Sequence, residues 1–222
     1  MPLQNRVTPF STIEAAPHRG LFMGNRGRLH DDHRRLVVTG WRSLAWLICA
    51  LEFRGRHRTV MAPHHYTELF FLDEAVALAA GHRPCAECRR PAFRAFMTAW
   101  AGNAGPPPRA TELDAALHRD RVARLRGHKH APATLATVPF GAFFVLPSSD
   151  GTPWIQLDDC AAAWSHAGYT GWARWPTSIE VDVLTPPATL AALRAGYRPI
   201  LHPSAKAVRA SSPTDPADRG RG

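Results

Sequence analysis

Cys85 and Cys88 form a Cys-x-x-Cys pair that lies directly after one predicted helix and directly before another. Gly81 is expected to end the first helix, because glycine accepts the left-handed backbone conformation that commonly closes helices, and Pro84 stiffens the approach to the first cysteine. A turn of this kind directs two thiols to one point, which supplies half of a tetrahedral zinc site or a redox dithiol. Segment 75–90 therefore predicts a chemical site more sharply than any other part of the chain.

The size and composition of the chain are those of a soluble globular protein. Its 222 residues are 45% hydrophobic, which is enough for one substantial domain or two small ones. The longest apolar runs, such as residues 44–51, are far shorter than the ~20 residues that a membrane-spanning helix needs. The N-terminal sequence MPLQNRVTPF lacks the apolar core of a secretory signal. We therefore expect a cytoplasmic protein with no membrane partner.

The cysteine content favours a reducing compartment. The four cysteines have no even framework of spacings and do not predict a disulfide scaffold; they are Cys49, Cys85, Cys88 and Cys160. The close pair is then interpreted as metal ligands or as a redox couple. Cys49 lies in an apolar run, where a small buried thiol with only a packing role is the commoner interpretation.

The first half of the chain predicts a knuckle-bearing α+β domain over residues 1–100. Branched and aromatic runs predict short strands, and Asp73 is well placed to cap the helix that Gly81 ends. A second helix is expected after the cysteine pair. The predicted strands are 36–39, 44–53, 58–62 and 68–72, and the predicted helices are 74–80 and 91–100.

The second half predicts a linker, a smaller β-rich domain and a tail. Residues 101–110 are rich in Gly and Pro and are expected to connect the two domains. The domain at 111–202 is predicted to begin with a helix at 111–125 and to contain a hairpin at 143–157, a strand at 179–184, a helix at 188–195 and a short strand near Ile200. Residues 203–222 have little apolar bulk and are expected to be disordered. The predicted class is α+β, with a small antiparallel sheet, helices and a Cys-x-x-Cys knuckle followed by the β-rich domain.

One short internal match connects the two halves. Residues 78–84 read LAAGHRP, and residues 193–199 read LRAGYRP. The second copy has no cysteines after it, and a single seven-residue match is weak support for a repeat. We interpret it as a shared way of ending a helix.

The segment FFLDEAVALAAGHRPCAECRR is similar to the end of the metal-binding domain of the Ada DNA-repair protein. That family has an extended FF-type strand, a short Ala-rich helix, a Gly-aromatic-Arg-Pro sequence and Cys-x-x-Cys in the same order. The resemblance covers about thirty residues and implies that Cys85 and Cys88 are two of four zinc ligands in a domain that contacts DNA phosphates. The two upstream cysteines of the family have no counterpart here; His57 lies at about the corresponding distance, and Met61 follows it.

The whole chain also resembles a bacterial protein family without an assigned activity. The motifs that carry this resemblance are GNRG-x-LH near the start, TELFFLDEA-x-ALAAGHRPCAECRR in the middle and LTPPxTxxALRAGYRP near the end. The predicted metal ligands are Cys85, Cys88, His57 and His65. Other residues that can complete the site are His64, His82 and Cys49.

The charge of the chain favours an anionic partner. It has 27 basic and 18 acidic residues, a net charge of +9, which attracts polyanions such as nucleic acid. The Gly-punctuated segment 23–30 offers backbone N–H and guanidinium groups that suit phosphate, with an ordered turn as the alternative. The predicted nucleic-acid contacts are Arg26, Arg28, Arg83, Arg89 and Arg90.

Three hypotheses follow. The first is a zinc-binding, nucleic-acid-associated protein in which Cys85 and Cys88 hold a structural metal. The second is an enzyme that uses the same two thiols as a redox couple. The third is a binding or scaffold protein that contains no metal. The sequence indicates no particular reaction, nucleic-acid preference or oligomeric state.

Overall fold

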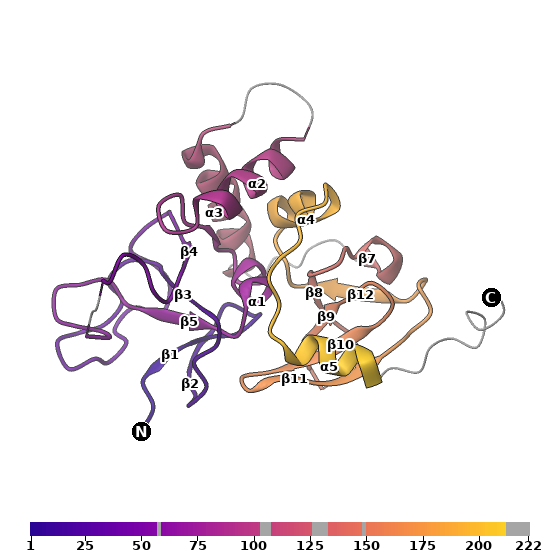
Figure 1. Ribbon diagram of the computed structural model, residues 1–222, viewed down its shortest axis with the longest axis horizontal. Helices are drawn as coiled ribbons and strands as arrows, with labels where there is room; N and C mark the ends of the chain where they lie inside the picture. Colours follow the sequence, from indigo (N-terminus) through magenta and orange to yellow (C-terminus); the bar gives the residue numbers. More distant parts are fainter. Residues whose placement is uncertain (57–58, 103–107, 126–132, 148–149, 212–222) are drawn as a thin grey trace.

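The computed structural model describes residues 1–56, 59–102, 108–125, 133–147 and 150–211, and these form two sheets with helices between and beside them (Figure 1). Each sheet has six strands. The predicted α+β class is confirmed. Among the described residues, no helix is both long and apolar enough to cross a membrane.

The first sheet is built from the N-terminal part of the chain and is mixed. Its strand order is β2-β1-β5-β3-β4-β6, in which β1–β5 and β4–β6 pair in parallel and the other neighbours are antiparallel. The sheet therefore differs from the antiparallel one that the sequence predicts. Its strands are β1 (Gln4–Val7), β2 (Ile13–Ala15), β3 (Phe22–Asn25), β4 (Leu47–Cys49), β5 (Leu69–Phe71) and β6 (Arg83–Pro84).

The second sheet comes from the C-terminal part and is antiparallel in the order β11-β10-β9-β8-β12-β7. The predicted hairpin is present, with Phe143 opposite Ile155. The strands are β7 (Ala133–Thr134), β8 (Phe143–Val145), β9 (Trp154–Gln156), β10 (Ala161–Ser165), β11 (Gly168–Ala173) and β12 (Glu180–Val183).

The helices lie between the two sheets and beside them. In Figure 1, α1 lies between the sheets, α2, α3 and α4 group together above it, and α5 runs along β11. The predicted helices after Asp73, after the cysteine pair and in the C-terminal half are all present. Their bounds are α1 (Glu74–Ala79), α2 (Arg90–Ala101), α3 (Ala110–Leu125), α4 (Pro187–Arg194) and α5 (Ser204–Ser211), with a 3-10 turn at Leu135–Thr137.

Asp73 caps α1 and also holds the C-terminal part of the chain. Its Oδ1 accepts a hydrogen bond from the Val76 backbone N–H at 3.0 Å, as an N-cap residue does. Its Oδ2 accepts from the Tyr169 hydroxyl at 2.7 Å and from the His202 backbone N–H at 3.0 Å. Burial raises the pKa of Asp73, whereas these hydrogen bonds act in the opposite direction. One buried carboxylate thus joins elements from both halves.

Glu74 makes a second connection of the same kind. Its Oε1 accepts hydrogen bonds from the Tyr197 hydroxyl at 2.6 Å and from the Arg89 guanidinium at 2.7 Å, and its Oε2 accepts from the Ile200 backbone N–H at 3.0 Å. All six residues of α1 are buried. A single cluster of buried hydrophobic residues extends from Val7 to Val208, so the core is continuous across the boundary predicted at 101–110.

The seven-residue match ends two helices with the same hydrogen bonds. Gly81 N–H donates to Leu78 O and His82 N–H to Ala77 O, while Gly196 N–H donates to Leu193 O and Tyr197 N–H to Ala192 O. Both glycines have positive φ, +85° and +96°. The interpretation of a shared helix ending is confirmed.

Three predicted strands and the first part of the predicted tail differ from the structure, whereas residues 212–222 of that tail lie outside the described residues. Leu36 makes only an isolated bridge to His30, residues 59–62 contain no strand, and neither does the segment around Ile200. The first of these segments is a loop whose backbone bonds to Leu29. Within the predicted disordered tail, α5 packs on β11 and buries Ala205 and Val208.

Candidate metal centre

The parallel pairing of β4 and β6 brings a third cysteine to the Cys-x-x-Cys pair. Leu47 lies opposite Arg83 and Ile48 opposite Pro84, so the next step of the same register places Cys49 beside Cys85. The Cys85 backbone N–H donates to Ile48 O at 2.9 Å, which fixes that alignment at the end of β6.

A tight turn carries the chain from Cys85 to Cys88 and into α2. The Glu87 backbone N–H donates to Cys85 Sγ at 3.4 Å, and the Arg89 backbone N–H donates to Cys85 O at 3.1 Å. Pro91 follows at the start of α2, where its fixed φ suits the first helical turn. The turn is therefore held by backbone bonds around the first cysteine.

The three thiols form a compact group. The Sγ atoms of Cys49, Cys85 and Cys88 all lie within 4.8 Å of one another, and all three cysteines are free of disulfides. Three thiolates bound to one zinc ion at ~2.3 Å lie about 3.8 Å apart in a tetrahedral arrangement. The observed spacing fits a metal ion with only small movements of the side chains.

The electrostatics of this group favour one thiolate at Cys85. Hydrogen bonds from the thiols of Cys49 and Cys88, together with backbone N–H groups, lower the pKa of Cys85 to about 2. The pKa of Cys49 is raised, mainly because its thiol donates to Cys85. For Cys88 the bond with Cys49 lowers the pKa, but the bond with Cys85 and burial raise it above the ordinary value. Negative charge is therefore favoured on Cys85 Sγ, a donor atom that a bound cation would contact.

The predicted histidines that lie among the described residues are not part of this group. His57 lies outside the described residues. His64 and His65 are exposed and do not join the group of close donor atoms found among the described residues. His82 is buried, and its Nε2 accepts a hydrogen bond from Arg26 Nε at 3.3 Å. Of the residues that the sequence offers to complete the site, Cys49 is the one that the structure places beside the pair, although a packing role was the commoner interpretation of its apolar run.

Of the five arginines predicted to contact nucleic acid, three are buried and two are exposed. Arg83 and Arg89 are buried and form ion pairs with Asp114 at 2.8 Å and Glu74 at 2.7 Å. The remaining buried residue, Arg26, lies over Trp46. The two more accessible ones are Arg28, which pairs with Asp32 at 2.9 Å, and Arg90 at the start of α2.

Comparisons of the chain with protein-family models, with curated proteins and with solved structures find no match. The class of the protein therefore rests on its own fold and site. It is an α+β protein with two six-stranded sheets and a three-cysteine cluster that can hold a metal ion.

Proposed function

We propose that the protein binds zinc through Cys49, Cys85 and Cys88 and that this metal has a structural role. The observation that supports the proposal most strongly is the third thiol, which comes from a different strand and lies 36 residues earlier in the sequence. A redox dithiol needs only the Cys-x-x-Cys pair, whereas three converging thiols match the donor set of structural zinc sites. The resemblance of segment 70–90 to the Ada metal-binding domain points the same way.

A bound metal ion would stabilise the packing of strands β4 and β6 of the first sheet against the start of α2. Cys49 ends β4, Cys85 follows β6, and Cys88 precedes α2 by two residues. A single ion bound to all three would hold these elements together, and its binding free energy would add to that of folding. Structural zinc sites have four ligands. Of the two histidines that the sequence predicts as ligands, His57 and His65, we propose His57 for the fourth position.

The test is the metal content of protein purified without added metal, measured by elemental analysis for the wild type and for single serine variants. Cys49→Ser, Cys85→Ser and Cys88→Ser are expected to lose the zinc, because each removes one thiolate ligand. Cys160→Ser is the matched control, since this cysteine, like Cys85, is buried and forms no disulfide but lies just before β10 in the second sheet. It should keep about one zinc per chain.

Circular dichroism identifies variants that have lost metal only because they are unfolded. Zinc retained in Cys49→Ser would contradict the three-thiol centre. No metal in any sample, combined with a reversible disulfide between Cys85 and Cys88, would favour the dithiol enzyme instead. His57→Ala, included in the same series, decides whether this residue is the fourth ligand.

A second candidate function, association with nucleic acid, is favoured by the exposed positive charge next to the cluster. Arg90 and Arg94 are both exposed, lie four residues apart on α2 and therefore share a helix face. The α2 sequence contains no acidic residue. This face and the net charge of +9 support contacts with phosphate groups.

Binding to fluorescently labelled duplex DNA and single-stranded RNA, measured by anisotropy at several salt concentrations, tests this candidate. Affinity should fall steeply with salt, and replacing both Arg90 and Arg94 with Gln should reduce the slope of log K against log salt by about 1.8 for DNA, because each phosphate contact contributes about 0.9. Arg198→Gln, which removes an exposed arginine from the other half, should leave the slope unchanged. Binding that does not respond to salt, or no binding, would eliminate this candidate.

A further inference from the structure

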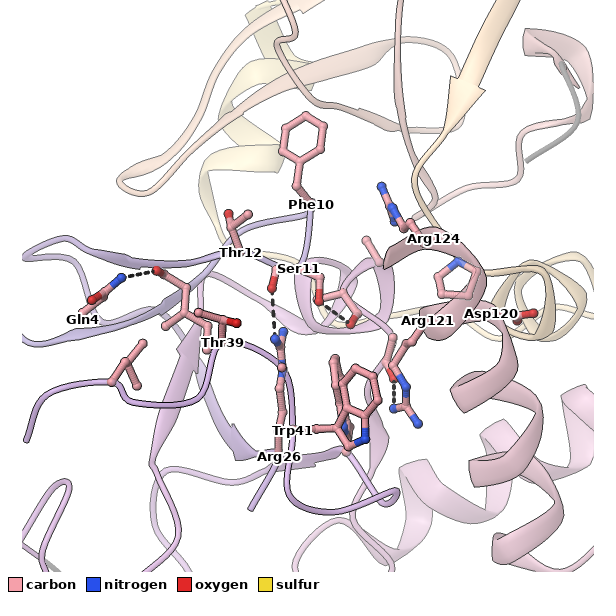
Figure 2. A pocket seen from close by; sticks show the side chains of 18 residues that line it. Gln4, Phe10, Ser11, Thr12, Arg26, Thr39, Trp41, Asp120, Arg121 and Arg124 are labelled. Carbon is pink, nitrogen blue, oxygen red and sulfur yellow. Dashed lines mark hydrogen bonds between the residues drawn. The ribbon is translucent and has the colours of Figure 1, made fainter. Parts of the chain in front are cut away.

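A cavity of about 870 Å³ lies beside the first sheet and is lined by none of the three clustered cysteines. Its walls come from the N-terminal segment, the loop before β4, the turn after α1, and α3 (Figure 2). Aromatic and aliphatic side chains supply much of the lining, including Phe10, Ile13, Leu36 and Trp41. Its volume falls within the range of small-molecule sites, ~300 to 1,000 Å³.

Arg26 lines this cavity and is buried without a carboxylate partner among the described residues. Its side chain is fully enclosed, with 1% of the residue exposed. Nη1 donates to Ser11 O at 2.9 Å and Nε donates to His82 Nε2 at 3.3 Å, but Nη2 has no hydrogen-bond partner. Figure 2 shows the guanidinium end of Arg26 reaching Ser11 within the lining. A buried cation with an unused donor is costly unless an anion approaches it.

A second guanidinium, that of Arg121, packs against the same indole ring as Arg26. The Cζ atoms of Arg26 and Arg121 lie 4.0 Å and 4.2 Å from the centre of the Trp46 ring. Arg121 donates to the backbone carbonyls of Gly81 at 3.0 Å and Leu44 at 2.8 Å, and its Nε is also buried without a partner. Burial, followed by the charge of Arg121, lowers the pKa of Arg26 to about 9, so the two cations oppose each other in the absence of an anion.

The outer part of the lining adds one more cation and one carboxylate. Arg124, also on α3, donates to Leu184 O. The Asp120 carboxylate accepts from the Ala188 backbone N–H at 3.4 Å. Three arginines against one aspartate leave the cavity lining with a positive balance.

We propose that this cavity binds a small organic anion that has a flat apolar body and a carboxylate or phosphate group. The anionic group would bind beside Arg26 or Arg121, each of which lines the cavity and has one N–H group without a partner. The flat body would lie against Trp41 and the neighbouring apolar wall. This site is independent of the metal centre, and it goes beyond the structural zinc and nucleic-acid functions proposed above.

Isothermal titration calorimetry with three compounds of one ring system tests the proposal. The probes are 1-naphthyl phosphate, naphthalene-1-carboxylate and the neutral naphthalene-1-methanol. At least one anion should bind to the wild type about tenfold or more tightly than the neutral compound, because hydrogen bonds to charged groups account for that difference. The anion that binds with the higher affinity shows whether the site prefers phosphate or carboxylate.

Two variants and one control locate the binding. Arg26→Gln should weaken the anion about tenfold or more while leaving the neutral compound unaffected. Gly40→Phe should block the cavity sterically, since a side chain at this lining position enters open space and leaves Arg26 in place. Arg198→Gln removes an exposed positive charge outside the cavity and should bind like the wild type.

Three results of these titrations would contradict an anion site in the cavity. Equal affinity for the anions and the neutral compound, no binding of either anion, or unchanged anion binding in Gly40→Phe would overturn the proposal. If Arg26→Gln does not fold, Gly40→Phe carries the decision alone, because it changes the volume of the site and not its buried charge.

Discussion

Two ion pairs of similar length differ strongly in how far they are exposed to solvent. Arg83 and Asp114 form a two-point pair at 2.8 Å, and their side chains are 6% and 11% exposed. Arg28 and Asp32 pair at 2.9 Å, but their side chains are 41% and 55% exposed. A buried pair depends on both partners, since the loss of one leaves an uncompensated charge inside the protein, whereas water screens an exposed pair.

Asp114→Ala is therefore expected to lower the free energy of unfolding by about 3 to 5 kcal/mol, because Arg83 stays buried without its carboxylate. Asp32→Ala is the matched control and should change it by about 1 kcal/mol or less. Urea unfolding of both variants, with zinc present at equal concentration, measures the difference. Similar losses in the two variants would contradict the buried role of the Arg83–Asp114 pair.

At the scale of elements, the two helix endings of the internal match differ in what surrounds the glycine. A Cβ atom added to Gly81 would lie 3.1 Å from both Cγ and Cδ of Arg121, whereas one added to Gly196 would meet nothing within 4 Å. Both positions have a φ that side chains other than glycine rarely adopt. At Gly81, both the positive φ and the nearby Arg121 side chain disfavour any residue other than glycine. At Gly196, only the positive φ does so.

Gly196→Ala is expected to destabilise the protein by about 1 kcal/mol through its left-handed backbone. Gly81→Ala should cost about 1 kcal/mol more, because Arg121 must move away from a position fixed by two backbone carbonyls. Urea unfolding curves of both variants give the comparison. A loss at Gly81 no greater than that at Gly196 would show that Arg121 adjusts freely.

For the whole molecule, local signals predict the elements better than their assembly. Asp73 and Gly81 mark the ends of α1 correctly, because capping depends on nearby residues. The proximity of Cys49 to Cys85 depends instead on the parallel pairing of two short strands, which no local pattern specifies. Helix α5 is missed because its few apolar residues, Ala205 and Val208, become significant only when β11 is beside them.

The stability of the whole molecule should decrease below neutral pH because of His82. Burial, followed by the charges of Arg26 and Arg121, lowers the pKa of His82 well below 6.5. As the pH falls through 6.5, the unfolded chain takes up a proton on this residue while the folded chain does not, so unfolding becomes more favourable. This contribution to stability is present above that pH and is lost below it.

Between about pH 7.5 and about pH 5.5, the free energy of unfolding is expected to fall by about 1.4 kcal/mol through this residue. His82→Gln should show a correspondingly smaller fall, since glutamine offers Arg26 an acceptor and does not titrate. His118, whose pKa is also lowered by burial, contributes to both proteins equally. Parallel pH profiles for wild type and variant, from urea unfolding, would exclude His82 as the source.

The buried carboxylates at the start of α1 have a consequence for how the chain can be divided. Asp73 and Glu74 belong to the first half, while the hydroxyls of Tyr169 and Tyr197 that bind them belong to the second. A polypeptide ending before the predicted linker would keep two buried acids and lose these donors; its complement would keep the donors and lose the acids. The two pieces would therefore be obligate halves of one cooperative folding unit, and not modules that evolution could exchange separately.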